Sequence, residues 1–274
     1  GIPFAAASAG AKLVLNGACH DPQELQQYII DEGVTATAAV PTIWSGMLAY
    51  LQSSGKNLGK LKNVVIGGSA VPRSMVQSFK NDYGIAVVHA WGMTETNPLG
   101  SISSPTMEVL AMNEEDQLTM NCKQGRAVSG VEMRIVSDDG VRLQHDGIAF
   151  GHLQVRGPWV VKSYYKDEGG SPLDAEGWFN TGDVATIDTY GYMQITDRSK
   201  DVIKSGGEWI SSIELENAAV GHPDIIEAAV IGVYHPKWEE RPLMVTVMRE
   251  GKTISNQEMC AYLEGKVAKW WMPE

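Results

Sequence analysis

Residues 194–216 read QITDRSKDVIKSGGEWISSIELE, and this stretch decides how the rest of the chain is interpreted. A charged cluster at 198–201 precedes a short apolar and basic run, which ends at the pair Gly206–Gly207. Adjacent glycines allow positive φ and let the backbone approach a ligand closely. Ser211 offers an N-cap to an apolar-periodic helix that we expect to run to Val220. This order predicts a hinge, a strand, a turn and a helix.

A charged loop and a β-turn would explain any one of these residues without a function. The combination resembles the signature at the junction of the large and small domains of adenylate-forming enzymes, Asp-Arg-x-Lys-Asp-x-Ile-x-x-x-Gly. The signature stands here as DRSKDVIKSGG, from Asp197 to Gly207. The continuation EWISS, from Glu208 to Ser212, is similar to the fatty acyl-CoA synthetase branch of that superfamily.

The composition is that of a globular chain of 274 residues, with 43% hydrophobic residues and a formal net charge of -11. The acidic balance, without a stripe of lysine and arginine, argues against nucleic acids and anionic membrane surfaces as partners. Three cysteines lie far apart without a metal-binding spacing, so we interpret them as free thiols and expect a cytoplasmic protein. The apolar runs are too short to predict a transmembrane segment.

The first part of the chain alternates short apolar runs with amphipathic segments, which is typical of a doubly wound α/β fold whose parallel sheet is covered on both faces. Strands are expected at residues 12–15, 34–40, 64–66 and 85–88, and helices are expected to open at Pro22, Pro41 and Pro72. We assign residues 1–197 to the C-terminal portion of a large adenylation domain, with 1–115 as its α/β part and 116–197 as a β-rich subdomain. Residues 198–274 are assigned to a small, mobile and incomplete α+β domain.

Two loops follow strands of the expected sheet, at the edge where ligands of such sheets bind. The first contains Gly67, Gly68 and Ser69, whose N–H groups and hydroxyl suit a phosphate, although a glycine pair after a strand is commonly only a turn. The second contains, in order, His89, Ala90, Trp91, Gly92, Met93, Thr94 and Glu95. Its alternative interpretation is an aromatic-lined turn.

The second loop resembles the Tyr-Gly-x-Thr-Glu motif of adenylate-forming enzymes, with Trp91 where tyrosine is usual. The resemblance implies that Thr94 bonds a nucleotide phosphate, that Glu95 holds Mg²⁺, and that Trp91 and Gly92 border the adenine or the acyl group. One carboxylate with substrate phosphates suits Mg²⁺, which takes few ligands from protein. His89 stands where the family often contacts the adenine edge, and a buried structural histidine is the alternative.

The β-rich segment carries short alternating runs with glycine and aspartate turns, such as Ser137–Gly140, which is a hairpin signal. At its far end, Gly177–Asp183 reads GWFNTGD and resembles the family motif Gly-Trp-Phe-x-Thr-Gly-Asp. The resemblance implies that Asp183 accepts hydrogen bonds from both ribose hydroxyls, and a carboxylate suits a vicinal diol.

The C-terminal segment predicts strands at 227–233 and 243–248, then a helix from the capping box at Ser255 to about Val267. The resemblance implies a phosphate-binding loop ending in lysine upstream of the matched region, and a further lysine segment beyond residue 274. Both neutralise charge that develops during the reaction, so we expect the chain as given to be inactive in adenylation by itself.

The resemblance implies ATP-dependent activation of a fatty acid through an acyl adenylate, followed by thioester formation, with ATP, Mg²⁺ and coenzyme A as cofactors. The implied catalytic residues are Thr94, Glu95, Lys200 and Lys204. Among them Lys200 is the implied hinge, and a solvated loop lysine is its alternative. The implied binding residues for nucleotide and coenzyme A are Gly67, Gly68, Ser69, His89, Ala90, Trp91, Gly92, Met93, Thr94, Asp183, Arg198, Lys204, Gly206, Gly207, Glu208 and Trp209.

Two other functions stay open at this point. One is an adenylate-forming enzyme with a different acceptor, and the other is a non-catalytic module that binds an acyl group or a nucleotide. A homodimer is a further expectation. The length of the acyl chain is left open, because scattered apolar residues shape an acyl tunnel.

Overall fold

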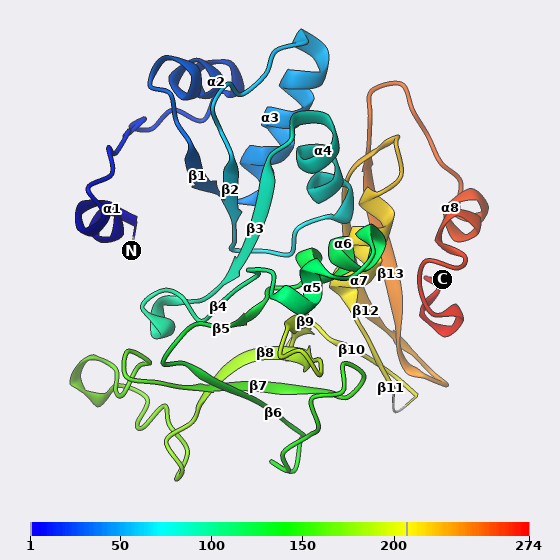
Figure 1. Ribbon diagram of the computed structural model, residues 1–274. Helices are drawn as coiled ribbons and strands as arrows, with labels where there is room; N and C mark the ends of the chain where they lie inside the picture. The colour runs from blue at the N-terminus through cyan, green and yellow to red at the C-terminus, as the bar shows by residue number, and fades with distance from the viewer. Residues whose placement is uncertain (1, 207, 274) are drawn as a thin grey trace. The chain divides into compact units, whose positions relative to one another are not determined.

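The computed structural model describes residues 2–206 and 208–273 (Figure 1). These residues divide into two compact units. The first unit runs to Val131 and also takes in residues 157–171. The second unit contains residues 132–156 and the chain from Pro172 onward. These units divide the chain differently from the boundaries expected at 115/116 and 197/198. Those boundaries concern functional domains rather than contacts, and they stay predictions.

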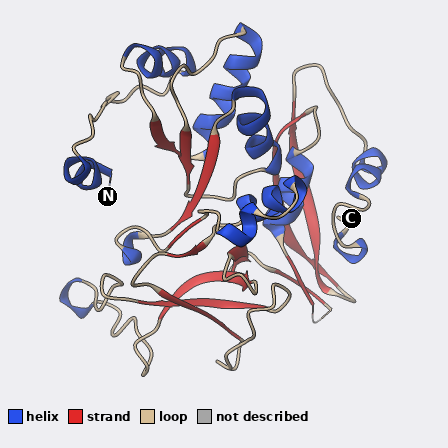
Figure 2. Cartoon of the chain, viewed as in Figure 1, coloured by secondary structure: helices blue, strands red, loops and turns tan. Residues whose placement is uncertain are grey.

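The first unit combines helices with short strands (Figure 2). Its helices are α1 (Ile2–Ala9), α2 (Pro22–Asp31), α3 (Pro41–Ser54), α4 (Arg73–Tyr83), α5 (Met107–Leu110) and α6 (Glu114–Cys122), with short 3-10 turns η1 (Thr94–Thr96) and η2 (Tyr165–Asp167). Its strands are β1 (Ala36–Ala39), β2 (Asn63–Ile66), β3 (Ala86–Trp91), β4 (Ser101–Ile102) and β5 (Arg126–Ala127). Within the described ranges, none of the helices is both long and apolar enough to cross a membrane.

The five strands of this unit form one sheet in the order β1-β2-β3-β4-β5. The first three run parallel with helical crossovers, which confirms the expected α/β architecture, and Ile66 of β2 lies beside His89 of β3. Strands β4 and β5 join antiparallel, so the sheet is mixed rather than purely parallel. The strand expected at residues 12–15 was wrong. Leu15 is 82% exposed there. Without a neighbouring strand to pair with, this apolar run gains little stability from an extended conformation.

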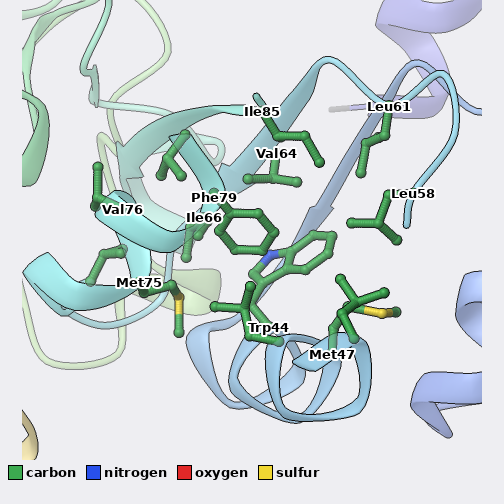
Figure 3. Packing of buried hydrophobic residues seen from close by; sticks show 14 of the residues in the cluster. Trp44, Met47, Leu58, Leu61, Val64, Ile66, Met75, Val76, Phe79 and Ile85 are labelled. Carbon is green, nitrogen blue, oxygen red and sulfur yellow. The ribbon is translucent and has the colours of Figure 1, made fainter. Parts of the chain in front are cut away.

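The core of the first unit gathers between the sheet and its helices (Figure 3). Trp44 of α3 meets Phe79 of α4 edge to face, with ring centroids 5.4 Å apart. Such aromatic pairs contribute about 0.5–1.5 kcal/mol beyond the area they bury. Val64 and Ile66, alternate residues of β2, are fully buried against these helices. This packing fixes the strand end from which the first predicted loop departs.

The second unit contains two antiparallel sheets, in the orders β6-β7-β8-β9 and β11-β10-β13-β12. The strands are β6 (Glu132–Val136), β7 (Phe150–Arg156), β8 (Phe179–Ile187), β9 (Met193–Arg198), β10 (Ile203–Ser205), β11 (Glu208–Ile210), β12 (Ile225–His235) and β13 (Glu239–Met248). Its helices are α7 (Ser212–Val220) and α8 (Asn256–Leu263), followed by the short turn η3 (Lys269–Trp271). Helix α8 ends earlier than expected from the sequence.

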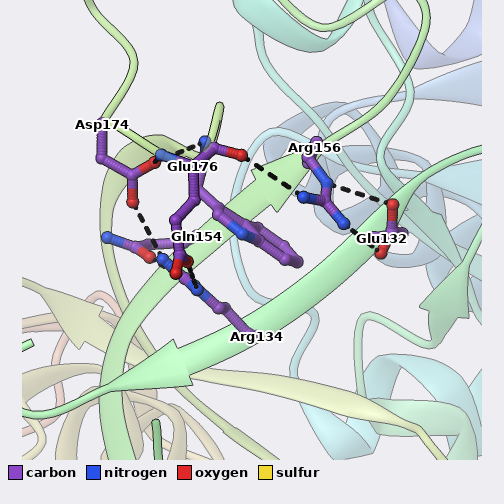
Figure 4. A network of polar contacts seen from close by, with 7 residues as sticks. Glu132, Arg134, Gln154, Arg156, Asp174 and Glu176 are labelled. Atoms are coloured by element: carbon purple, nitrogen blue, oxygen red, sulfur yellow. Dashed lines mark hydrogen bonds and ion pairs between the residues drawn. The ribbon is translucent and has the colours of Figure 1, made fainter. Parts of the chain in front are cut away.

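Polar contacts brace the start of β8 (Figure 4). The guanidinium groups of Arg134 and Arg156 lie 4.4 and 4.6 Å from the ring of Trp178, which precedes β8. Arg134 also bonds Asp174 and Glu176, at 2.8 and 2.6 Å. Arginine suits these contacts, because its planar guanidinium stacks on an aromatic ring and keeps several N–H groups in fixed directions. The contacts anchor the segment that leads to Asp183.

Candidate active site

The loop after β2 lies against the end of β3. A Cβ atom added to Gly67 would sit 2.8 Å from the carbonyl oxygen of Ala90, so only glycine fits this close backbone approach. Gly68 has φ of +92°, and Gly68 and Ser69 are exposed. The structure thus brings the two predicted loops to one carboxyl edge of the sheet, as the sequence predicted. Their contact with a nucleotide stays a prediction.

His89 is almost completely buried, at 1% exposure, and its ring has protein partners. Its Nδ1 lies 3.1 Å from the carbonyl oxygen of Cys122, and Gln124 Nε2 lies 3.5 Å from its Nε2. Burial lowers the pKa of His89, while hydrogen bonds to carbonyl groups of Cys122 and Ser69 oppose that shift. With Nδ1 donating to the Cys122 carbonyl oxygen, Nε2 can accept from the Gln124 side-chain amide. These contacts agree with the structural alternative, and contact of His89 with adenine stays a prediction.

Trp91 and Gly92 form a tightly packed corner at the end of β3. Trp91 is 8% exposed, and a Cβ atom on Gly100 would fall 2.3 Å from its ring. A Cβ atom on Gly92 would overlap the Pro98 carbonyl oxygen at 1.8 Å. Packing alone therefore requires glycine at position 92. Met93 follows and is half-buried.

The turn η1 presents the predicted phosphate and metal residues. The buried Thr96 hydroxyl accepts from the Met93 amide at 2.9 Å and faces the Pro98 carbonyl oxygen at 2.9 Å, which holds the turn. Thr94 is exposed and Glu95 is half-buried. The Thr96 hydroxyl thus fixes the loop from within, and Thr94 remains accessible to solvent.

The sequence did not predict two hydrogen-bond partners of Glu95. The amide of Val161 donates to the Glu95 carbonyl oxygen at 2.8 Å, and the Tyr164 hydroxyl donates to its carboxylate Oε1 at 3.0 Å. Both come from residues 157–171, which fold back onto the first unit. The tyrosine pair at 164–165 was visible in the sequence, but nothing local indicates this long-range return.

The carboxylate of Glu95 has the chemistry expected of a Mg²⁺ ligand. It is a hard oxygen donor, half-buried and held by a hydrogen bond. Among the described residues, no group of three or more His, Cys, Asp or Glu could hold a metal ion by itself. A Mg²⁺ ion that completes its coordination with substrate phosphates and water needs only one or two protein carboxylates, so Glu95 fits that role.

The two residues predicted to bind the ribose lie opposite each other on β8 and β9. Asp183 and Arg198 are register partners, and Asp183 Oδ1 lies 3.9 Å from Arg198 Nε. The Asp183 amide donates to Thr181 Oγ1 at 3.1 Å, and that hydroxyl donates to the Leu153 carbonyl oxygen at 2.9 Å. Gly182 has φ of +76°, which glycine adopts without strain. Asp183 is thus fixed within β8 by its backbone amide, which bonds a hydroxyl anchored on β7.

Lys200 lies exposed in the turn after β9. The amides of Asp201 and Val202 close this turn on the Arg198 carbonyl oxygen, at 2.9 and 3.0 Å. Asp197, just before it, is 1% exposed, and its carboxylate accepts from the amides of Arg198 and Ser212, both at 2.8 Å. Burial raises the pKa of Asp197, against the effect of these bonds. The sequence signature contained Asp197 without assigning it this role as a link between β9 and α7.

The hairpin β10–β11 positions Lys204 opposite Trp209. Lys204 Nζ lies 5.6 Å from the Trp209 ring centroid, a cation–π contact. The other ring neighbours of Trp209 are Phe150 and His152 of β7, at centroid distances of 5.4 and 6.0 Å. Glu208 is exposed.

Of the two predicted glycines in this hairpin, Gly206 has φ of +61°. Its amide donates to the Trp238 carbonyl oxygen at 2.8 Å, and a Cβ atom on it would lie 2.9 Å from the Trp238 ring. Both observations account for glycine at this position without a ligand. Gly207 lies outside the described residues.

The predicted site residues are thus divided between the two units. Thr94 and Glu95 lie with the loop Gly67–Ser69 in the first unit, whereas Asp183, Arg198, Lys200, Lys204 and Trp209 lie in the second. Their roles toward substrates stay predictions.

Comparisons with known proteins identify the family of the chain. Residues 2–165 match the model of the AMP-binding enzyme family, and residues 214–274 match the AMP-binding enzyme C-terminal domain. The chain is 47% identical to a medium-chain-fatty-acid–CoA ligase of Ectopseudomonas oleovorans, over 100% of this chain and 50% of the relative. It is 50% identical to a 3-methylmercaptopropionyl-CoA ligase of Ruegeria lacuscaerulensis, over 100% of this chain and 51% of the relative.

A solved structure shows the same fold. The o-succinylbenzoate CoA synthetase of Bacillus subtilis, in complex with its acyl-adenylate intermediate, is 27% identical, with a TM-score of 0.81 over 98% of this chain and 52% of that one. The chain spans about half the length of the curated relatives it matches. The match to the AMP-binding enzyme model covers more than half of the residues here. The chain belongs to the family of AMP-binding enzymes.

Proposed function

We propose that the protein containing this chain activates a fatty acid with ATP and then transfers the acyl group to the thiol of coenzyme A. The observation that carries this proposal is the meeting of Gly67–Ser69 and His89–Glu95 at one carboxyl edge of the sheet. Ligands of open α/β sheets bind at such edges. Membership of the AMP-binding family and 47% identity to a fatty acid–CoA ligase supply the substrate class.

In the first half-reaction, the carboxylate of the acid attacks the α-phosphate of ATP, the acyl adenylate forms, and pyrophosphate leaves. Reactions of this kind depend mainly on positioning and on neutralising phosphate charge. The exposed Thr94 hydroxyl donates to a phosphate oxygen, and the backbone N–H groups of the Gly67–Ser69 loop are further donors. Glu95 would hold Mg²⁺, which supplies positive charge beside the phosphates when it is bound.

The nucleotide sugar is assigned to Asp183 and Arg198. The Asp183 carboxylate accepts hydrogen bonds from the two ribose hydroxyls, and Arg198 adds donors beside it. Hydrogen bonds to a charged group are worth about 1.5–3 kcal/mol, so this pair would contribute substantially to nucleotide affinity.

In the second half-reaction, the coenzyme A thiol attacks the acyl carbonyl carbon, the thioester forms, and AMP leaves. We assign Lys200 as the hinge about which the C-terminal segment turns between the half-reactions. Lys204, Glu208 and Trp209 would then line the reacting site, with Gly206 and Gly207 beside the pantetheine arm. The turn at Lys200 supports the hinge, because the Lys200 side chain is exposed there.

The experiment is product analysis on the protein at its natural full length, with ATP, Mg²⁺, coenzyme A and a panel of short, medium and long acids. The two curated relatives differ in the acyl group they are named for, so the panel is needed. The proposal requires an acyl-CoA thioester together with AMP and pyrophosphate. Adenylate without thioester would indicate another acceptor. Nucleotide binding without any product would indicate a non-catalytic module.

We also propose a homodimer in the cytoplasm. The described structure contains Cys19, Cys122 and Cys260 as free cysteines, which agrees with a reducing compartment. Light scattering on the purified protein and fractionation of cells that express it test the two parts separately.

A further inference from the structure

Glu95 is tied to residues 157–171 by its backbone and by its side chain. Its carbonyl oxygen accepts from Val161 N at 2.8 Å, and its carboxylate Oε1 accepts from the Tyr164 hydroxyl at 3.0 Å. Glu95 is only half-buried, so without the bond from Tyr164 its carboxylate would sample several rotamers.

The segment that carries Tyr164 is itself fixed. Trp159 Nε1 donates to the Leu99 carbonyl oxygen at 3.4 Å, and a Cβ atom on Gly130 would lie 2.9 Å from the Trp159 ring. Val160 is 6% exposed. Three successive residues, Trp159, Val160 and the Val161 amide, thus anchor the chain just before Tyr164, and the hydroxyl is held in a defined place.

The phenol suits a donor role. The Tyr164 hydroxyl donates a hydrogen bond to Glu95 Oε1 at 3.0 Å. The adjacent Tyr165 differs: it is 79% exposed, and Lys166 Nζ lies 5.2 Å from its ring centroid.

We propose that Tyr164 is a positioning residue that orients the Glu95 carboxylate toward the Mg²⁺ of bound nucleotide. The hydroxyl occupies one lone pair of Oε1 and sets the rotation of the carboxylate, which leaves its other lone pairs directed at a cation. Hydrogen-bond partners of metal ligands typically change metal affinity by about 10–100-fold when they are removed. This inference rests on the proposed function, because it requires nucleotide with Mg²⁺.

The test compares Tyr164→Phe with the matched control Tyr165→Phe in the full-length protein. ATP binding is followed by calorimetry over a series of Mg²⁺ concentrations, and kcat and KM are measured over the same series. For Tyr164→Phe, we expect the Mg²⁺ concentration at half-maximal ATP binding to rise by about 10-fold, with recovery at excess Mg²⁺. Tyr165→Phe should match the wild type.

A double-mutant cycle separates positioning from packing. In a Glu95→Gln background, Tyr164→Phe should have no further effect on the Mg²⁺ dependence, because the group it acts through is gone. An unchanged Mg²⁺ dependence in Tyr164→Phe would overturn the inference. The inference would also be overturned if Tyr164→Phe lost ATP binding that excess Mg²⁺ does not restore and had a lower melting temperature. A wild type that binds ATP independently of Mg²⁺ would instead overturn the role assigned to Glu95.

Discussion

Asp183 of β8 and Arg198 of β9 lie directly opposite each other in an antiparallel ladder, with 3.9 Å between Oδ1 and Nε. The Asp183 side chain is 13% exposed, whereas that of Arg198 is 73% exposed. A largely buried acceptor thus stands beside an exposed donor, and both are fixed by strand register rather than by loop conformation. The arrangement can present a carboxylate and a guanidinium to one small polar ligand.

Asp183→Ala should weaken ATP binding by about 1–3 kcal/mol, because two ribose donors lose a charged acceptor. Calorimetry measures the change. Asp139→Ala is a suitable control, since Asp139 is exposed in the turn after β6. Nucleotide affinity equal to that of the control would remove Asp183 from the site.

Lys200→Pro should spare adenylate formation and depress thioester formation in the full-length protein, because proline fixes φ where a hinge must change it. The turn bonds come from the Asp201 and Val202 amides, so proline at 200 leaves them in place. Lys200→Ala, which keeps the backbone free to rotate, should retain both half-reactions. The two rates are measured by pyrophosphate exchange and by acyl-CoA release from preformed adenylate. Equal loss of both rates in the proline variant would refute the hinge.

The contact between Phe150 and Trp209 joins residues before and after Lys200, so rotation at Lys200 should separate them. We expect Phe150→Ala to favour the other orientation by about 0.5–1.5 kcal/mol, the usual value of an aromatic pair. The rates of the two half-reactions should then change in opposite directions. Tyr234→Ala, at a residue that is 82% exposed, is the control. Parallel changes in both rates would mean that the contact only supports the fold.

Glu214→Gln and Glu258→Gln should change the free energy of unfolding in opposite directions. Chemical denaturation at several pH values measures both changes. Burial raises the pKa of Glu214, so its ionised form costs stability in the folded state. As pH rises from the unfolded pKa through the higher folded pKa, the wild type should lose stability relative to Glu214→Gln. At neutral pH the glutamine variant should be the more stable, and the difference should shrink in acid.

Glu258 provides the opposite case. Hydrogen bonds with the Ser255 side chain and amide lower the pKa of Glu258, so its ionised form stabilises the fold above the unfolded pKa. Glu258→Gln should therefore be less stable than the wild type at neutral pH. That deficit should vanish as pH falls through the folded pKa. If the pH dependence had the same sign for both glutamine variants, the assigned causes would be wrong.

Features set by local chemistry could be read from the sequence. Asp21 caps α2 through the Glu24 amide, and Ser255 forms the expected capping box with Glu258. Gly55 ends α3 with φ of 67°. Such signals act within one helical turn, so they survive without knowledge of the tertiary structure.

Features set by long-range contact could not be read in this way. Strands β4 and β5 were missed because each has only two residues and gains its order from the neighbouring β3. The return of residues 157–171 to the first unit has no periodic signature, and Tyr164 was missed with it. The site was therefore predictable where a motif follows a strand, and unpredictable where distant segments complete it.

The transfer of an isotopic oxygen tests the central claim most directly. The full-length protein is incubated with ATP, Mg²⁺, coenzyme A and a fatty acid whose carboxylate carries ¹⁸O, and the AMP is analysed by mass spectrometry. Attack of the carboxylate on the α-phosphate leaves one carboxylate oxygen on AMP when the thioester forms. We predict AMP with one ¹⁸O atom and acyl-CoA in equal amount. Unlabelled AMP, or ADP with phosphate as the nucleotide products, would contradict an acyl-adenylate mechanism.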